Sequence, residues 1–537
     1  MPIIFQPNRI LTTAAITLSL CLLLNVADAA ILQGNVQLDG TARAGVVVTA
    51  QHGVSGIETS VFSDAAGNYT FETLAGGSYT IVAKASGWIG SREKRELSSD
   101  SRKMVDFRLS GDPLFAMTLP SATWLDLLPD GDMRREFILN CASCHEISGA
   151  RIMRDGKPRS VEDWAEAIAL MRAIDAYGLT PQDFDDAKYA TWLGTHLDSK
   201  AIAKLEPGPL ASGAALDARF TEYPVPLSPS LPHDLVLGPH GRVWITAFYN
   251  NVVWALSPNT GEIQTFNVNE NADVMGQVRA LNFDRSGQLW ILLGGTESLV
   301  RLNPADGAIE TFAVGMYPHS IEIDSAGKLW FNDYISSSEK IGSIDPKSRE
   351  LNLFQMPSAN LTSLQGLPLL YGLQIDAEDV LWGTMLAANK LFRFDTNTGA
   401  AVLFDMPMLN SGPRRLGIAP DGSLWIPEFN TGTVAHFDPE TSLFTRHELG
   451  LATLGPYDVA VDPVSGHVWA AASLGSAMIR INPATGARDD YPLPTEPAYP
   501  RHMAIDPVTG DLWTTYSSMP DATPKIVRIE LRDPDRK

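Results

Sequence analysis

The sequence predicts a mainly β protein in which an N-terminal β-sandwich, a small α-helical domain and a C-terminal seven-bladed β-propeller follow one another. Three observations carry this prediction. Short runs that alternate apolar and polar residues fill the N-terminal part, helical spacing begins near Asp132, and tryptophans recur every 40 to 52 residues in the C-terminal part. We therefore divide the chain into segments 1–29, 30–110, 111–200 and 217–530.

Length and charge limit the classes of function. A chain of 537 residues exceeds what one hydrophobic core ordinarily holds, which favours several domains. Acidic residues outnumber basic ones and give a formal net charge of -21. This balance disfavours nucleic acid and anionic membranes as partners and favours a basic protein partner.

The first 29 residues have the pattern of a secretory signal peptide. Arg9 is the only early charge, an apolar run follows from Ile10 to Leu24, and Ala27-Asp28-Ala29 fits a small-x-small cleavage site. Cleavage would remove Cys21 and leave two cysteines in the mature chain. The apolar run is short for a membrane span, with an uncleaved anchor as the alternative. We expect no transmembrane segment after the signal is removed.

Residues 141 to 145 read C-x-x-C-H, the sequence at which a c-type haem is covalently attached. Cys141 and Cys144 can each form a thioether to one haem vinyl group, and His145 then lies under the ring as the proximal iron ligand. A redox dithiol or half of a zinc site is the alternative, but neither a βαβ pattern nor further zinc ligands at suitable spacing accompany the motif. We expect one c-type haem. Because its attachment is completed outside the bacterial inner membrane, a periplasmic location is expected.

A cytochrome needs a second axial iron ligand, for which Met153, Met171 and His196 are candidates. Met171 lies in the run 164–172, whose apolar residues have helical spacing, and Thr180 is placed to cap a last helix. The order of motif helix, loop, methionine and closing helix resembles the class I cytochrome c domain. This resemblance implies Met171 as sixth ligand, with Met153 as its main rival and a packing role as the alternative. His/Met coordination favours reduced iron and suits electron transfer.

Residues 30–110 read as a small β-sandwich. Strand-like runs such as 79–83 are separated by turns rich in Gly and Asp, such as 64–68. The stretches GNVQLDGTARAGVVVTA and SDAAGNYTFETLAGGSYTIVAKASGW resemble the carboxypeptidase regulatory-like domain, a transthyretin-like fold. The resemblance implies an accessory module with a structural or interaction role, and nothing in it looks catalytic.

Seven units repeat between residues 217 and 530. Each contains a tryptophan that follows Val or Leu, at positions 244, 290, 330, 382, 425, 469 and 513. The spacing is the length of a four-stranded propeller blade, so seven units predict seven blades. The seventh unit stops near Ile529 without a fourth strand, while residues 219–223 form an extra strand before the first unit. We expect this extra strand to complete the last blade.

The repeats resemble the virginiamycin B lyase (streptogramin lyase) family over residues 217–530, with PxxI…DGxLWF…IgrIdPxTGxIteF recognisable in most units. In that family a late blade begins Glu-Pro-His, whose His acts as base and whose Glu helps to hold magnesium. Here the last unit begins Tyr499-Pro500-Arg501 and the one before it Gly455-Pro456-Tyr457. The catalytic pair of the family is therefore missing, and lyase activity is the less favoured reading.

Other residues match parts of the family's pattern. His233 and His319 stand at the Pro-His position, but in the first and third units, and Glu428 is a lone match to a Glu common in these blades. The first positions of the inner strands line one mouth of a propeller. They form a cationic and aromatic set that comprises His233, Arg279, His319, Arg414, Arg415, Tyr457, Arg501 and His502. Such a set suggests a small anionic or polyhydroxyl ligand, or a docking face for haem propionates, with pairing to nearby Asp234 and Asp458 as the alternative.

Together these features favour a periplasmic c-type haem protein that acts in electron transfer as part of an oxidoreductase system, with the propeller as a platform for a substrate or partner. The alternatives are a virginiamycin B lyase-like carbon-oxygen lyase and a non-enzymatic envelope binding protein. The acidic surface would steer a basic redox partner protein. The substrate, the electron donor and the electron acceptor stay open.

Overall fold

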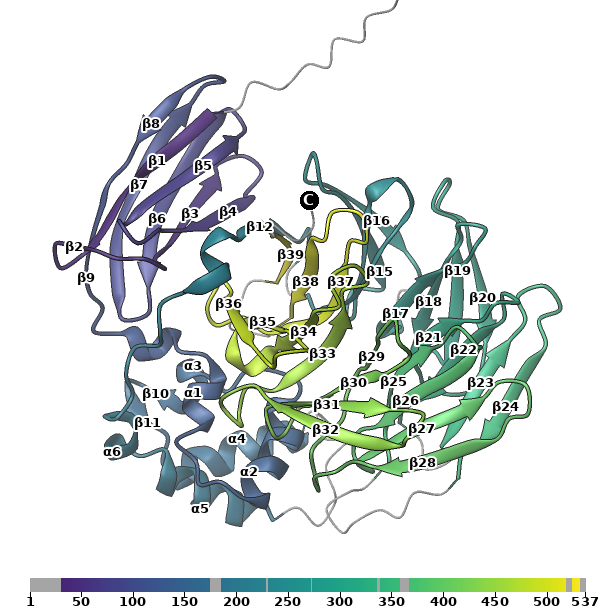
Figure 1. The fold of residues 1–537 in the computed structure, drawn as a ribbon. Helices are drawn as coiled ribbons and strands as arrows, with labels where there is room; N and C mark the ends of the chain where they lie inside the picture. The colour runs from purple at the N-terminus through teal and green to yellow at the C-terminus, as the bar shows by residue number, and fades with distance from the viewer. Residues whose placement is uncertain are drawn as a thin grey trace, which may run out of the picture.

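The computed structural model describes residues 30–173, 185–227, 230–271, 273–335, 339–357, 367–517 and 524–531. Figure 1 shows a β-sandwich, a group of helices beside it and a large β-propeller. The expected signal peptide and the expected cap at Thr180 lie outside the described residues. Within the described ranges, no helix has the length and hydropathy needed to cross a membrane.

The N-terminal sandwich buries one side of each strand. In β5, exposed and buried side chains alternate from Asn68 onward, so its apolar residues form part of the sandwich core. Tyr69 fixes the loop opposite, because its hydroxyl donates to the Val105 carbonyl at 2.6 Å. The strands are β1 Ala30–Leu38, β2 Thr41–Ala42, β3 Val47–His52, β4 Glu58–Phe62, β5 Asn68–Leu74, β6 Gly77–Ala85, β7 Trp88–Leu97, β8 Arg102–Met104 and β9 Phe107–Gly111.

The helical segment follows, over residues 112–218. The expected helix before the cysteines is formed by α2, and a π-type turn, η2, continues it to Ala142. The expected last helix is α5, and Asp185 caps it by accepting from the Lys188 amide at 3.0 Å. The elements are η1 Phe115–Thr118, α1 Ser121–Leu125, α2 Asp132–Phe137, η2 Ile138–Ala142, α3 Gly149–Ile152, β10 Met153–Arg154, β11 Lys157–Pro158, α4 Val161–Ala173, α5 Asp186–His196, α6 Ser199–Ile202 and η3 Gly213–Asp217.

Six four-stranded antiparallel sheets form separate propeller blades. The first three are β13 Pro232–Leu237, β14 Val243–Ala247, β15 Val252–Ser257, β16 Glu262–Asn267; β17 Val278–Phe283, β18 Leu289–Leu293, β19 Ser298–Leu302, β20 Ile309–Ala313; and β21 Pro318–Ile323, β22 Leu329–Asp333, β23 Lys340–Ile344, β24 Leu351–Gln355. A short 3-10 turn, η4 Pro239–Gly241, lies within the first of these blades.

The next three blades continue the same order. They are β25 Leu370–Ile375, β26 Val380–Met385, β27 Lys390–Asp395, β28 Ala401–Asp405; β29 Gly417–Ile418, β30 Leu424–Glu428, β31 Thr433–Asp438, β32 Leu443–Glu448; and β33 Pro456–Val461, β34 Val468–Ala472, β35 Ala477–Ile481, β36 Arg488–Pro492, with η5 Ser473–Gly475 between β34 and β35.

In three of the blades the repeated tryptophan is hydrogen-bonded to the first turn of its own blade. The indole nitrogen of Trp290 donates to Asp284 at 2.9 Å, and those of Trp330 and Trp382 donate in the same way to aspartates six residues before them. The indoles also pack on the outer strands, as Trp244 does on Phe266, where the ring centroids are 5.1 Å apart. The repeat that is visible in the sequence therefore marks the core between neighbouring blades.

The prediction of a seven-bladed propeller is wrong, because the residues that the structure describes form six separate four-stranded blades. The strands of the last repeat, β37 Pro500–Ile505, β38 Leu512–Tyr516 and β39 Lys525–Glu530, belong to a thirteen-stranded sheet. In that sheet β12 Arg219–Pro224 pairs with β39, as expected, but its other edge pairs with β4 of the sandwich. β37 lies against both β33 and β13. One end of the large sheet thus occupies the place between the sixth blade and the first.

An ion-pair cluster ties the sandwich to the propeller at this joint. The Lys525 ammonium lies 2.8 Å from Glu58 of β4 and 3.0 Å from Glu222 of β12. Both carboxylates raise the pKa of Lys525 against the lowering effect of burial. The sandwich is therefore continuous with the propeller through both backbone pairing and charge.

Candidate functional site

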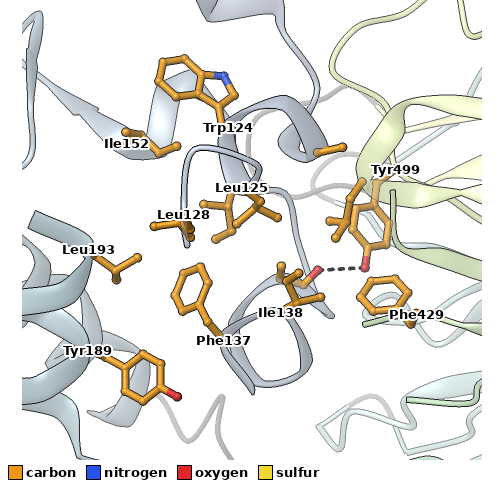
Figure 2. Close-up of a cluster of buried hydrophobic side chains, with 14 of the residues drawn as sticks. Trp124, Leu125, Leu128, Phe137, Ile138, Ile152, Tyr189, Leu193, Phe429 and Tyr499 are labelled. Carbon is orange, nitrogen blue, oxygen red and sulfur yellow. Dashed lines mark hydrogen bonds between the residues drawn. The ribbon is translucent and has the colours of Figure 1, made fainter. Parts of the chain in front are cut away.

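The helical segment is seated on the mouth of the propeller. Leu125, Phe137 and Ile138 of the helices share one hydrophobic core with Phe429 and Tyr499 of the propeller, as Figure 2 shows. The propeller mouth therefore packs against the helices. The C-x-x-C-H motif belongs to the part of the helical segment that lies on this mouth.

Hydrogen bonds from propeller side chains to backbone carbonyls hold the motif on the propeller mouth. The Tyr499 hydroxyl lies 3.0 Å from the carbonyl oxygens of both Ala142 and Ser143. Arg501 donates from Nη2 to the Cys144 carbonyl at 2.6 Å. Since these bonds use backbone carbonyls, they hold the loop in place and leave the side chains of the motif free to point elsewhere.

Those side chains point into a cavity of about 450 Å³ within the helical segment. Cys141, Cys144 and His145 line it, and so does Met171 from α4. The two cysteines are not joined by a disulfide. The described lining residues all fall between 137 and 193, so the cavity belongs to the helices. The structure therefore brings together all four residues that the sequence assigned to a haem.

The chemistry of this cavity fits a c-type haem. Its walls are apolar, with Phe137, Ile147, Trp164, Ile168 and Leu193, as a porphyrin ring requires. The His145 ring places Nδ1 2.9 Å from the Glu146 carbonyl, and when Nδ1 carries the proton, Nε2 is the nitrogen with the lone pair for iron. Such a backbone contact orients the ring and selects its tautomer.

Three arginines also line the cavity and were not singled out from the sequence. They are Arg151, Arg154 and Arg159, and their charges suit the two propionates of a haem. Arg154 already contacts Asp163 and lies 2.8 Å from Glu166. The sequence signal was present as three arginines within the nine-residue stretch 151–159 that follows the motif, but only the fold turns them toward one cavity.

The rival ligands lie elsewhere. Met153 is in β10, half-buried against the hydrophobic core of the segment, and His196 ends α5 with its ring 6.0 Å from that of Trp192. Neither is part of the described cavity lining, whereas Met171 is. The position of Met171 is thus consistent with the sequence assignment, and the other two candidates would need a different arrangement of the segment.

The mouth residues are buried, and the helical segment packs against Tyr457 and Arg501. His233, His319, Arg414, Tyr457 and Arg501 are each at most 5% exposed. His502 is apart from them, with its side chain 24% exposed and 3.8 Å from Asp458. A ligand at this mouth would have to displace packed side chains. The sequence could not show this, because residues in contact, such as Cys144 and Arg501, are 357 positions apart in the chain.

The family-like residues do not assemble a magnesium site among the described residues, where no group of three or more His, Cys, Asp or Glu could hold a metal ion. The ring centroids of His233 and His319 are 6.1 Å apart. Glu428 is fully buried in β30 and accepts from Thr433 Oγ1 and Arg446 Nε, both at 2.6 Å. Its role here is structural.

Burial and charge decide the protonation of the mouth. Burial lowers the pKa of His233 to about 3 and that of His319 well below its usual value, so both are neutral at pH 7. Burial raises the pKa of Tyr457, but the guanidiniums of Arg501 and Arg414, with a further one nearby, outweigh it and hold the pKa below its ordinary value. The phenol of Tyr457 is hydrogen-bonded to that of Tyr371.

We expect one tyrosine of the folded protein to ionise below the ordinary range for tyrosines, which is near pH 10, because of these guanidiniums. In a spectrophotometric titration at the tyrosinate band, Tyr457→Phe should remove this early step, and Tyr334→Phe, where burial raises the pKa, should keep it. Because the pKa of Tyr457 is lower in the folded protein than in the unfolded chain, its ionisation stabilises the folded protein at pH values above the unfolded pKa. This contribution to the free energy of unfolding is lost as the pH falls through the folded pKa. Identical early steps in wild type and Tyr457→Phe would contradict the assignment.

Two parts of the chain, the propeller and the N-terminal sandwich, match known protein families. The virginiamycin B lyase family matches residues 286–531, and the carboxypeptidase regulatory-like domain matches residues 31–110. A virginiamycin B lyase of Nocardia farcinica (strain IFM 10152) is 28% identical over 193 residues, which are 36% of this chain and 61% of that protein. The chain thus spans less than two thirds of this relative.

Two solved structures share the propeller fold. A streptogramin B lyase structure has a TM-score of 0.52 at 20% identity and covers 60% of this chain and 100% of its own. A catalytically inactive virginiamycin B lyase from Staphylococcus aureus with quinupristin has a TM-score of 0.51 at 17% identity, covering 58% and 99%. The chain therefore carries a virginiamycin B lyase-like β-propeller and a carboxypeptidase regulatory-like N-terminal domain, with the helical segment between them.

Proposed function

We propose that this is a periplasmic c-type haem protein that transfers electrons as part of an oxidoreductase system. The observation that carries the proposal is the convergence of Cys141, Cys144, His145 and Met171 on one apolar cavity. Two thiols, an imidazole and a thioether are the groups that a six-coordinate c-type haem uses. In this account the propeller supports the haem segment and its surroundings.

Each residue has a defined task. Cys141 and Cys144 would attach the haem, and His145 and Met171 would ligate its iron. The apolar walls exclude water, and the three cavity arginines would hold the propionates. When bound, the haem supplies a one-electron redox centre.

The position of the cavity favours a separate redox partner. Leu170, which is 57% exposed, and Arg154 and Glu166, which are also exposed, form part of its lining, so the cavity reaches the surface of the helical segment. The propeller mouth lies on the other side of the motif backbone. A partner would therefore approach α4, and a substrate in the propeller would be farther from the redox centre.

Rapid mixing with redox proteins tests this function. The reduced protein should pass electrons to a basic electron-carrier protein faster than to an acidic one, and added salt should slow the basic pair by about tenfold or more. Leu170→Asp should slow exchange with the protein partner and leave exchange with ferricyanide unchanged. Leu409→Asp, at a propeller loop residue that is 72% exposed, is the matched control. A haem that exchanges electrons with no protein carrier would contradict the proposal.

A lyase-like activity at the propeller is the second candidate, and the family match over residues 286–531 is the observation in its favour. Against it stands Arg501, at the position where the family pattern has the histidine that acts as base, and this position is buried against the helical segment. Turnover of a cyclic streptogramin ester by the full chain would favour this candidate.

A further inference from the structure

Three arginines at the propeller mouth, of which Arg414 and Arg501 are buried and Arg279 is half-buried, have aromatic partners in place of carboxylates. Arg279, Arg414 and Arg501 are all at the starts of inner strands or just before them, and among the described residues none has a carboxylate within ion-pair distance. Arg414 lies 4.0 Å from the ring centroid of Phe429, and Arg501 lies 4.9 Å from that of Tyr499. Buried charges are ordinarily paired, so this arrangement is unusual.

The acids nearby are engaged with other groups. Asp234 lies 2.6 Å from Arg415 and 2.7 Å from His233. Asp458 accepts from the amides of Val459 and Met503. The mouth therefore holds an excess of positive charge, with Tyr457 as the acidic group in closest contact with Arg501, at 3.0 Å.

This excess charge is next to the C-x-x-C-H motif. Arg501 spans the two sites, because Nη1 donates to the Tyr457 hydroxyl and Nη2 donates to the Cys144 carbonyl at 2.6 Å. Cys144 directly precedes His145 in the chain. Arg414 lies near Arg501, because both guanidiniums contact the ring of Tyr457, at 4.6 Å and 5.1 Å from its centroid. Arg414 also donates from Nη1 to the Tyr371 hydroxyl at 3.1 Å. Both guanidiniums are shielded from water, so solvent screens their fields weakly.

We propose that Arg501 and Arg414 are positioning residues of the propeller that set the reduction potential of the haem in the neighbouring segment. The proposal rests on the proposed function, since it requires the haem. Oxidation of haem iron adds one positive charge, and fixed positive charge nearby in a medium of low dielectric opposes that addition. The two guanidiniums thereby favour the reduced iron and raise the potential.

This gives the propeller a task that its family resemblance does not. Arg501 and Tyr499 hold the motif backbone, and the charge behind them acts on the redox centre without touching it. In a propeller with an open mouth, residues at these positions could bind a substrate. Here Tyr499 and Arg501 bind the backbone of the helical segment instead. The haem potential then depends on the docking of the helices on the propeller.

Potentiometric titration of the purified full-length haem protein tests the proposal. Arg501→Gln and Arg414→Gln should each lower the midpoint potential of the haem. The expected shift is about 59 mV, which corresponds to a tenfold change in the equilibrium constant with a one-electron reference couple. Arg285→Gln is the matched control, because it removes the same charge from an exposed residue whose guanidinium donates to the Ser325 carbonyl at 2.7 Å. Its midpoint should stay at the wild-type value, and the low-spin absorption spectrum should be the same in all variants.

The outcomes are distinct. Midpoints of both Gln variants that equal that of Arg285→Gln would overturn the inference while leaving the haem protein itself intact. Absence of haem from the wild type would overturn the proposed function and this inference with it. If Arg501→Gln fails to fold or to retain haem, Arg414→Gln decides the question, because Arg414 makes no hydrogen bond to the motif backbone among the described residues.

Discussion

Replacing Met171 by Ala should convert the haem iron from a six-coordinate low-spin form to a five-coordinate or water-ligated form. Met171 is the candidate sixth ligand that lines the cavity with Cys141, Cys144 and His145. Loss of its thioether removes the ligand that stabilises reduced iron, so the reduction potential should also fall. Absorption spectra of the ferric and ferrous protein would detect the change in coordination, and titration would detect the change in potential.

Met153→Ala and His196→Ala are the matched controls for this prediction. Both residues belong to the same helical segment but are outside the described cavity lining. Each variant should keep the low-spin spectrum of the wild type. A low-spin spectrum in Met171→Ala together with its loss in Met153→Ala would reassign the ligand, and the loop before α4 would then have to rearrange.

Replacing Tyr499 by Ala should loosen the helical segment from the propeller. The side chain is fully buried in the shared core, and its hydroxyl holds the carbonyls of Ala142 and Ser143. Removal of a buried aromatic ring of this size costs about 3–5 kcal/mol of unfolding free energy. We expect a large fall in stability by denaturant titration and faster hydrogen exchange over α2 and η2.

Tyr499→Phe separates the ring from its hydrogen bonds. It keeps the packing and removes only the hydroxyl, so the cost should be about 1 kcal/mol. If Tyr499→Ala destabilised the propeller but left hydrogen exchange in α2 and η2 unchanged, the helices would not depend on the propeller mouth, and the proposed effect of Arg501 and Arg414 on the haem potential would lose its structural basis.

The sequence predicted the repeating parts of the fold well, for a physical reason. Each repeat carries its own tryptophan in the core between neighbouring blades, as Trp290 shows, and Trp290 also donates to the aspartate of its own turn. The pairing of β12 with β39 also followed from the missing last strand. Local patterns of this kind need only a few dozen residues to be recognised.

Contacts between distant segments were beyond the sequence. The pairing of β12 with β4 merges the last repeat with the sandwich, and no alternation of residues in either strand distinguishes this edge from an open one. The cover over the mouth was missed for the same reason. Arg501 and Tyr457 read as residues of an open ligand site, whereas the structure buries them against the helices.

The candidate haem site was predictable to a greater extent because its motif is contiguous. Cys141, Cys144 and His145 lie within five residues, and Met171 follows on a helix whose spacing is visible. The cavity arginines required the fold, since basic residues after a motif are ordinarily solvated. The motif thus predicted which residues could bind a haem. Only the structure shows which other residues line the cavity and that the motif backbone contacts the propeller mouth.

Covalent haem attachment is tested directly by the mass and absorption spectrum of the full chain exported by a bacterium that attaches c-type haem. We expect one covalently bound haem per chain, with sharp α and β bands on reduction, and loss of both in a Cys141→Ala/Cys144→Ala variant. An exported, folded chain that carries both cysteines as free thiols and shows no haem absorption would contradict this expectation.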